Sequence, residues 1–338
     1  MKSFTFFILL LVVASCQPKQ IENKANSYFD LQEKGVKAGG VKMIPIMAGK
    51  YKVWTKRVGN NPTIKLLLLH GGPAVTHEYF ESFDSFLPQE GFEYYYYDQL
   101  GSYYSDQPTD SSLWTTARFV EEVEEVRQAL KLDSSNFFLL GSSWGGILAM
   151  EYALKYQKNL KGLIISNMMA SAIDYGKYAD EVLAKQMDAN VLTELRAIES
   201  KKDFGNPRYM ELLTPNFYEQ HLCRFPAAEW PEPVNRSFKH INNSIYTMMQ
   251  GPSEFGISGR LAKWDVKERL PELKIPTLTI GAQHDTMNPD HMKWISTQVQ
   301  QGRYLYCPEG SHLSMWDDQA HYFPGLIQFI KDVDTKKF

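Results

Sequence analysis

The sequence has no long run of lysine or arginine, and its 36 basic and 39 acidic side chains give a formal net charge of −3 over 338 residues. A protein that binds nucleic acid needs a basic face to meet the phosphate groups. The charge pattern therefore argues against nucleic acid as a partner. Internal repeats and low-complexity tracts are absent as well, which excludes repeat architectures and extended disorder for most of the chain.

Cysteine is also scarce, with only three in the chain. Cys223 and Cys307 show no spacing that favours a disulfide, so we expect two free, mostly buried thiols. What remains is the composition of a folded protein, with 43% apolar and 22% charged residues. A chain of this length can bury a large core as one domain, or as one domain with an insertion.

The N-terminal apolar stretch, residues 4–13, is too short to span a bilayer as a stable anchor. Placed after a basic residue, it is typical of a secretory signal peptide. It ends in Val13-Ala14-Ser15-Cys16, which resembles the bacterial lipobox. We therefore expect a lipoprotein signal peptide at 1–15, a lipid anchor on Cys16, and a polar tether over 16–40. The alternative is an ordinary secretory signal that contains a cysteine. Either form is exported, and the anchored form would sit at a bacterial membrane, on its periplasmic or surface face.

Hydrophobic periodicity predicts alternating strands and helices. Two alternating segments between residues 41 and 58 indicate a hairpin at a sheet edge. Continuous apolar runs predict buried strands, and apolar residues at helical spacing predict helices. The strands are expected at 64–69, 92–97, 137–140, 163–166, 277–280 and 304–306, and the helices at 115–130 and 147–156.

This order of elements is typical of a mainly parallel, doubly wound α/β sheet. Residues 170–264 differ, because they contain helical segments broken by proline and glycine and no clear strand. We expect them to form a helical cap, called the cap segment below. It would be inserted between two parts of one core, residues 41–169 and 265–338.

The segment Gly141-Ser142-Ser143-Trp144-Gly145 fits the G-x-S-x-G pattern of a nucleophile elbow. The pattern alone is weak, because glycine and serine are common. Its setting gives it weight, since it follows a short buried strand and opens a helix, where a sharp turn exposes the Ser143 hydroxyl. The alternatives are a glycine-rich turn without catalysis and a dinucleotide-binding loop, whose glycine spacing does not match. We therefore expect the α/β-hydrolase fold.

A serine hydroxyl becomes a nucleophile only when a base removes its proton, and a carboxylate must orient that base. His312 is the best of the eight histidines, because it lies in a loop just after the last predicted strand. Asp285, past the end of the strand before, is the simplest acid. This gives the chain order serine, acid, histidine that the fold requires. Asp290 and Asp317 are the alternative acids.

The oxyanion of a tetrahedral intermediate needs backbone N–H donors. His70-Gly71-Gly72-Pro73 is a glycine-rich turn at the end of a central strand. We expect the N–H of Gly72 and the N–H of Trp144, the residue after the nucleophile, to donate together to the oxyanion. The other interpretation is a plain strand-end turn. Chemistry of this kind requires no metal and no organic cofactor.

Four motifs together carry a more specific resemblance. They are His70-Gly71-Gly72-Pro73, Asp98-Gln99-Leu100-Gly101, Gly141-Ser142-Ser143-Trp144-Gly145-Gly146 and Gly310-Ser311-His312. Together they resemble the proline iminopeptidase family, serine exopeptidases of the α/β-hydrolase fold. The cap motif 251–255 is similar to that of the tricorn-interacting aminopeptidase branch. The resemblance implies Ser143, Asp285 and His312 as the triad, and short peptides that lose an N-terminal residue, often proline, as substrates. It also implies that Glu254 holds the substrate's α-ammonium.

Departures from the family pattern bear on the amine site. Ala74 and Tyr103 stand where the family usually has glycine. Thr286 follows Asp285 at the position where the branch has a second amine-binding glutamate. A buried ammonium with one carboxylate missing is costly, so we expect Glu229 or Glu232 to supply the second charge.

Two other functions stay open. The same triad serves esterases and amidases that act on small acyl substrates, and Thr286 favours such an activity. A non-catalytic lipoprotein could use the pocket to bind a ligand, although the presence of all three triad residues argues against it. A haloalkane dehalogenase or epoxide hydrolase is disfavoured, because Ser143 stands where those enzymes would have an aspartate.

Overall fold

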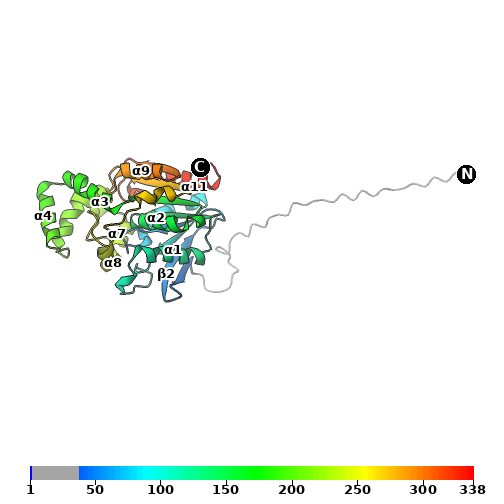
Figure 1. Cartoon of the computed structure of the whole chain (residues 1–338), viewed down its shortest axis with the longest axis horizontal. Helices are drawn as coiled ribbons and strands as arrows, with labels where there is room; N and C mark the ends of the chain where they lie inside the picture. The colour runs from blue at the N-terminus through cyan, green and yellow to red at the C-terminus, as the bar shows by residue number, and fades with distance from the viewer. Residues whose placement is uncertain (2–37) are drawn as a thin grey trace. The chain divides into compact units, whose positions relative to one another are not determined.

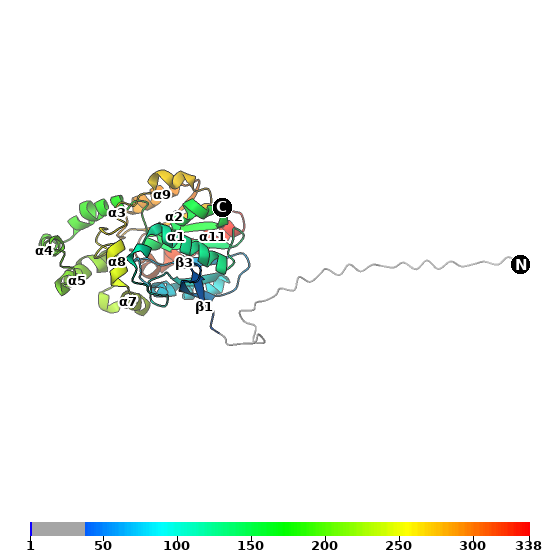
Figure 2. The ribbon, with the colours of Figure 1, turned by 60° about the horizontal axis from the view of Figure 1, so that its bottom comes forward.

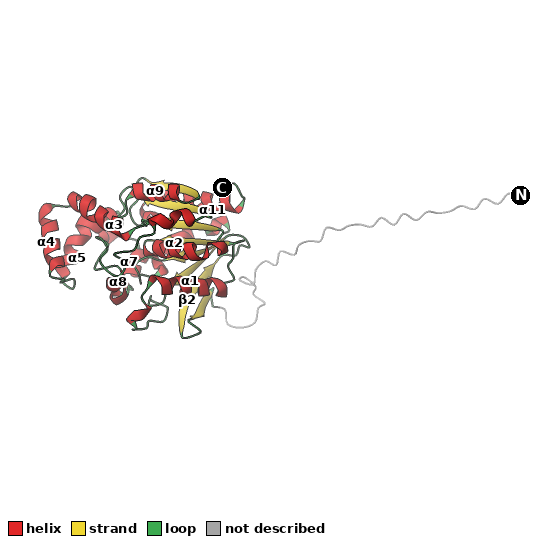
Figure 3. Ribbon diagram, viewed as in Figure 1, coloured by secondary structure: helices red, strands yellow, loops and turns green. Residues whose placement is uncertain are grey.

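The described part of the chain contains a mixed sheet of eight strands (Figure 3). The computed structural model describes Met1 and residues 38–338. The strand order is β1-β2-β4-β3-β5-β6-β7-β8. The strands are β1 (Val41–Ile46), β2 (Tyr51–Val58), β3 (Lys65–Leu69), β4 (Glu93–Asp98), β5 (Phe137–Ser142), β6 (Gly162–Ser166), β7 (Pro276–Ala282) and β8 (Gln301–Cys307).

The sheet is antiparallel only at one end. The hairpin β1–β2 lies at that end, β2 pairs antiparallel with β4, and the pairs from β4 through β3, β5, β6 and β7 to β8 are parallel. This confirms the α/β-hydrolase fold class with its edge hairpin. Several strands run further than expected. β5 ends at Ser142 instead of residue 140, β8 begins at Gln301 instead of residue 304, and β4 ends at Asp98, which pairs with Trp54.

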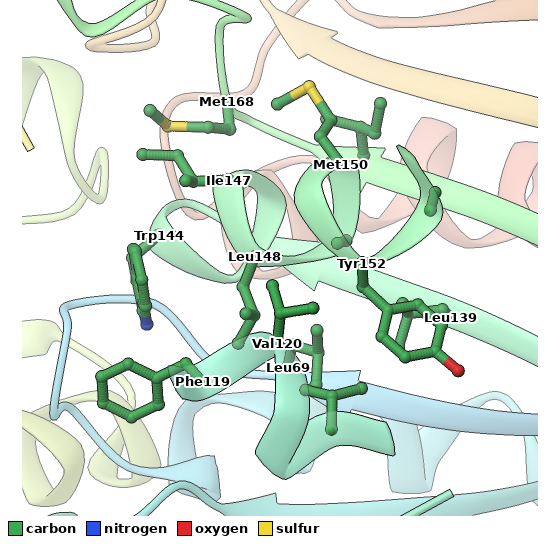
Figure 4. Close-up of a cluster of buried hydrophobic side chains, with 14 of the residues drawn as sticks. Leu69, Phe119, Val120, Leu139, Trp144, Ile147, Leu148, Met150, Tyr152 and Met168 are labelled. Atoms are coloured by element: carbon green, nitrogen blue, oxygen red, sulfur yellow. The ribbon is translucent and has the colours of Figure 1, made fainter. Parts of the chain in front are cut away.

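Helices cover both faces of the sheet because successive strand side chains point to opposite sides. Leu67 and Leu69 of β3 pack in one cluster with α1 (Thr116–Ala129), α2 (Trp144–Tyr156) and α9 (Pro289–Gln298). Leu66 and Leu68 pack in a second cluster with η1 (His77–Ser85) and α11 (Gln319–Asp334). Figure 4 shows Leu148 of α2, Val120 of α1 and Leu69 of β3 in the first of these clusters. Burial on both faces explains the continuous aliphatic run of β3.

From Ala172 to Met249, between β6 and β7, the chain forms helices. They are α3 (Ala172–Tyr178), η5 (Ala179–Leu183), η6 (Ala184–Gln186), α4 (Ala189–Ser200), α5 (Pro207–Leu213), η7 (Thr214–Tyr218), α6 (Glu219–His221), η8 (Ala227–Glu229), α7 (Glu232–Lys239) and α8 (Asn243–Met249). Several of them share an apolar cluster of their own, with Leu195, Leu213 and Phe217 fully buried in it. Helices α3, α4, α7 and α8 lie together beside the sheet (Figures 1 and 2). An isolated bridge between Ser171 and Asp265 joins the two ends of this segment.

Short helices complete the described chain. They are η2 (Pro88–Glu90), η3 (Ser111–Leu113), η4 (Gln157–Asn159), η9 (Lys267–Glu272) and α10 (Ser314–Asp317). Cys223 and Cys307 are both free and buried, as expected. Across residues 38–338, no helix combines the length and apolar character needed to cross a membrane. The expected signal peptide, Cys16 and the tether up to residue 37 lie outside the described residues.

Candidate active site

Ser143 occupies the sharp turn between β5 and α2. Its backbone has φ 56° and ψ −128°, a conformation that residues other than glycine rarely adopt. Gly145 makes this turn possible, because a Cβ there would lie 2.0 Å from the carbonyl oxygen of Leu69. The glycine of the motif is therefore required by the close approach of α2 to β3.

Gly145→Ala should lower the free energy of unfolding by more than about 3 kcal/mol, because the new methyl group meets backbone that cannot yield. Urea unfolding of the purified protein measures this. Gly176→Ala in α3 is the matched control, since a Cβ at Gly176 meets nothing within 4 Å. It should be neutral or slightly stabilising. Equal effects of the two substitutions would contradict this account of the turn.

The structure brings Ser143, Asp285 and His312 to one edge of the sheet. They follow β5, β7 and β8, and the carboxyl ends of parallel strands meet at the same edge. His312 Nδ1 lies 2.8 Å from Asp285 Oδ1, and both residues are buried. The Nδ1–H donates to the carboxylate, so Nε2 carries the lone pair. Nε2 has no hydrogen-bond partner among residues 38–338, and His312 lines the same cavity as Ser143.

Neither alternative acid is the partner of His312. Asp290 is exposed in the first turn of α9. Asp317 is half-buried and accepts from the backbone N–H and the hydroxyl of Ser311. The neighbouring His284 makes backbone contacts instead: its carbonyl oxygen lies 2.9 Å from His221 Nδ1, and its N–H donates to the Gly310 carbonyl oxygen at 3.0 Å.

The glycine-rich turn after β3 lies directly against Ser143. A Cβ on Gly71 would come within 2.8 Å of the Ser143 Cβ, and Gly72 lines the same cavity as Ser143. The Gly71 N–H is already used, because it donates to the Tyr79 hydroxyl at 2.8 Å. Trp144 is the first residue of α2, so its N–H has no acceptor within that helix.

Gln99 ties this turn to the start of α2, a role that its motif alone did not reveal. Its Nε2 donates to the His70 carbonyl oxygen at 3.0 Å, and its Oε1 accepts from Trp144 Nε1 at 2.8 Å. The Gln99 backbone N–H donates to His70 Nε2 at 3.1 Å. Burial lowers the pKa of His70 to about 4, so this ring is neutral and can accept that bond. The Gln99 side chain thus holds together the two segments that carry the Gly72 and Trp144 N–H groups.

Glu254 lines the same cavity and is buried. Tyrosines from three cap elements hold it. The Tyr246 hydroxyl donates to Oε1 at 2.5 Å, the Tyr175 hydroxyl donates to the Glu254 carbonyl oxygen at 2.5 Å, and the Glu254 N–H donates to the Tyr218 hydroxyl at 3.2 Å. Oε2 has no partner among residues 38–338. Burial raises the pKa of Glu254 above its usual value, and the nearby His312 opposes this.

The expected second carboxylate is not in the cavity lining. Glu229 is exposed, and Glu232 is exposed and pairs with Arg236 at 3.1 Å. The expectation that one of them supplies the missing charge is wrong, because η8 and the first turn of α7 place both at the surface. Thr286 is buried, with Oγ1 3.0 Å from His312 Nδ1 and 3.3 Å from Asp285 Oδ1. It contacts the acid–histidine pair instead of adding a charge.

No cluster of three or more histidine, cysteine, aspartate or glutamate side chains in the described residues could hold a metal ion.

Comparison with known proteins gives the family. A family model described as alpha/beta hydrolase fold matches residues 65–319. The proline iminopeptidase of Flavobacterium johnsoniae is 67% identical over 297 residues, which cover 87% of this chain and 99% of that protein. That of Elizabethkingia meningoseptica is 66% identical over 300 residues, covering 88% and 100%. The proline iminopeptidase of Saccharolobus solfataricus is 35% identical over 284 residues, covering 84% and 89%.

Solved structures agree with this placement. The crystal structure of the proline iminopeptidase of Mycobacterium smegmatis superposes with a TM-score of 0.78 at 27% identity, covering 88% of this chain and 100% of that one. The crystal structure of VinJ gives a TM-score of 0.81 at 27% identity, covering 87% and 98%. The resemblance in the motifs is therefore confirmed. The chain belongs to the proline iminopeptidase family of α/β hydrolases, and it is a serine aminopeptidase.

Proposed function

We propose that this protein releases N-terminal residues, proline among them, from short peptides through an acyl-enzyme on Ser143. Asp285 orients His312 through Nδ1, and His312 Nε2 takes the Ser143 proton as Oγ attacks the first carbonyl carbon. The N–H groups of Gly72 and Trp144 stabilise the oxyanion of the tetrahedral intermediate. His312 then gives the proton to the leaving amine, the C–N bond breaks, and a water molecule hydrolyses the ester by the reverse route.

The observation that carries the proposal is the unpartnered Oε2 of Glu254. A buried carboxylate oxygen without a hydrogen bond is costly unless a ligand completes it, and an α-ammonium group is a suitable partner. Glu254 lines the same cavity as Ser143 and His312, so a substrate whose amine is bound by Glu254 presents its first carbonyl group to Ser143. A fixed amine anchor makes the enzyme an exopeptidase.

The rest of the lining supports a compact apolar first residue. Val75, Leu222, Phe238 and Leu313 line the cavity together with the polar residues named above. Such a surface favours an aliphatic side chain or the ring of proline and disfavours a charged one.

A panel of aminoacyl arylamides with matched N-acetyl derivatives and simple acyl esters tests this proposal. We expect prolyl and small aliphatic arylamides to be cleaved. Acetylation should lower kcat/KM at least 100-fold, because it removes the positive charge that Glu254 binds. Equal cleavage of the acetylated forms would overturn the proposal in favour of an esterase or amidase.

The pH dependence of Ser143 reactivity follows from the surroundings of His312. Burial disfavours the imidazolium, but the Asp285 carboxylate and its hydrogen bond outweigh burial, and Glu254 adds to them, so the pKa of His312 lies above 6.5. Only the neutral ring acts as a base. The rate of labelling by a fluorophosphonate, which carries no titrating group, should therefore fall tenfold per pH unit below an inflection above pH 6.5. An inflection clearly below 6.5 would contradict this assignment.

We also propose that the protein is exported and carries a lipid anchor on Cys16, as the lipobox-like residues before it suggest. Mass spectrometry of the N-terminal peptide from membranes of a bacterial expression host tests this. A diacylated Cys16 at the new N-terminus is the expected result, with Cys16→Ser as a variant that lacks the modification. An unmodified Cys16 in a protein recovered from the soluble exported fraction would favour the ordinary secretory signal.

A further inference from the structure

Asn167 follows directly after β6, the strand between β5, which leads to Ser143, and β7, which leads to Asp285. The residue is fully buried and has a φ of 54°, a conformation that asparagine tolerates better than most residues. It does not line the cavity that holds Ser143. No motif in the sequence drew attention to it.

The Asn167 side chain joins the acid loop to the histidine loop. Its Nδ2 donates to Asp285 Oδ2 at 2.7 Å and to the Ser311 carbonyl oxygen, one residue before His312, at 3.1 Å. Its Oδ1 accepts from the hydroxyls of Ser166 at 2.7 Å and Ser314 at 3.0 Å. The Asp285 carboxylate fixes the orientation of the amide, because a flipped amide would turn its oxygen toward that carboxylate, which can only accept hydrogen bonds. The two hydroxyls then donate to Oδ1.

Asp285 therefore receives hydrogen bonds on both oxygens. Oδ1 accepts from the Met287 N–H at 3.0 Å and lies 2.8 Å from His312 Nδ1, while Oδ2 accepts from Asn167. If Asn167 were lost, the carboxylate could rotate away from the imidazole, and the loop that carries His312 would lose its link to the loop that carries Asp285.

We infer that Asn167 is a positioning residue that fixes Asp285 and the His312 loop in one arrangement. The inference rests on the proposed function, because it presupposes that Asp285 and His312 act on Ser143. Asn167 acts through Asp285 and touches no substrate, so its loss should lower kcat and leave KM nearly unchanged.

Two variants test the inference. Asn167→Asp keeps the shape but places a second carboxylate against Asp285 Oδ2, and Asn167→Gly removes the side chain while allowing the positive φ. We expect kcat on a prolyl arylamide to fall about 100-fold or more for Asn167→Asp and about 10- to 100-fold for Asn167→Gly, with KM changed less than about threefold. The added charge should also move the inflection of fluorophosphonate labelling to higher pH in Asn167→Asp only.

Ser314→Ala is the matched control, because it removes one donor to Oδ1 and leaves the bonds from Nδ2 to Asp285 and Ser311 in place. It should lower kcat less than about threefold. Folded Asn167 variants that retain kcat within threefold of wild type would overturn the inference, as would a loss of activity with KM rising in parallel and the labelling inflection unmoved. Wild type that neither labels nor cleaves would instead overturn the proposed function.

Discussion

Ser143→Ala is expected to lower kcat on a prolyl arylamide by at least about 10⁴-fold, because it removes the atom that attacks the carbonyl. The rest of the site should stay intact. The turn is held by Gly145, the Asp285–His312 pair does not depend on Ser143 Oγ, and alanine fills nearly the same space. Steady-state kinetics and circular dichroism of the purified variant check both parts.

Labelling by a fluorophosphonate gives the control for Ser143→Ala. Ser142 is buried beside it and lines the same cavity. Ser142→Ala should still be labelled, whereas Ser143→Ala should not. A wild-type protein that resists the probe would favour a ligand-binding lipoprotein without catalysis, and a labelled Ser143→Ala would place the nucleophile elsewhere.

Glu254→Gln is expected to lower kcat/KM for substrates with a free amine by about 100- to 1,000-fold. Without the Glu254 carboxylate, the α-ammonium group of the bound substrate is buried without a negatively charged partner. The substitution keeps the shape of the side chain and its contact with Tyr246. Hydrolysis of an activated ester of cyclopentanecarboxylic acid, which resembles a prolyl ester but has no amine, should change less than about threefold.

Glu232→Gln is the control for Glu254→Gln, since that carboxylate is exposed and pairs with Arg236 at the surface. It should leave both activities unchanged. If Glu254→Gln lowered amine and amine-free substrates equally, Glu254 would support the cap and would not bind the amine.

The proximity of Ser143, Asp285 and His312 could be predicted from the sequence because the carboxyl ends of parallel strands lie at the same edge of a sheet. Ser143, Asp285 and His312 each follow a segment that the sequence predicts as a strand, and the fold brings the three strand ends to one edge. Gly145 could be predicted from the G-x-S-x-G pattern, because the nucleophile elbow requires a glycine at that position. Local pattern and overall topology agree at these positions.

The cap segment was much less predictable. Its helical character follows from composition, but the face that each helix turns toward the core depends on tertiary packing. Glu254 was found only through its motif, and Glu232 was assigned a role that its exposed position does not allow. The three tyrosines that hold Glu254 lie on three different cap elements, so no local pattern joins them.

The contacts of Asn167 and Thr286 could not be predicted from the sequence. The sequence shows that Thr286 brings no charge, but the proximity of its hydroxyl to His312 appears only when the loops after β7 and β8 meet. Asn167 contacts Asp285 across 118 positions of the chain, in a site with no spacing rule.

One labelling experiment tests both the nucleophile Ser143 and the amine anchor Glu254. The probe is a diphenyl phosphonate analogue of proline, with its free amine or with that amine acetylated, and peptide mapping by mass spectrometry locates the adduct. We predict a covalent adduct on Ser143 with the free-amine probe, formed at least 100-fold faster than with the acetylated one. Equal rates for the two probes, or an adduct on another residue, would contradict the account.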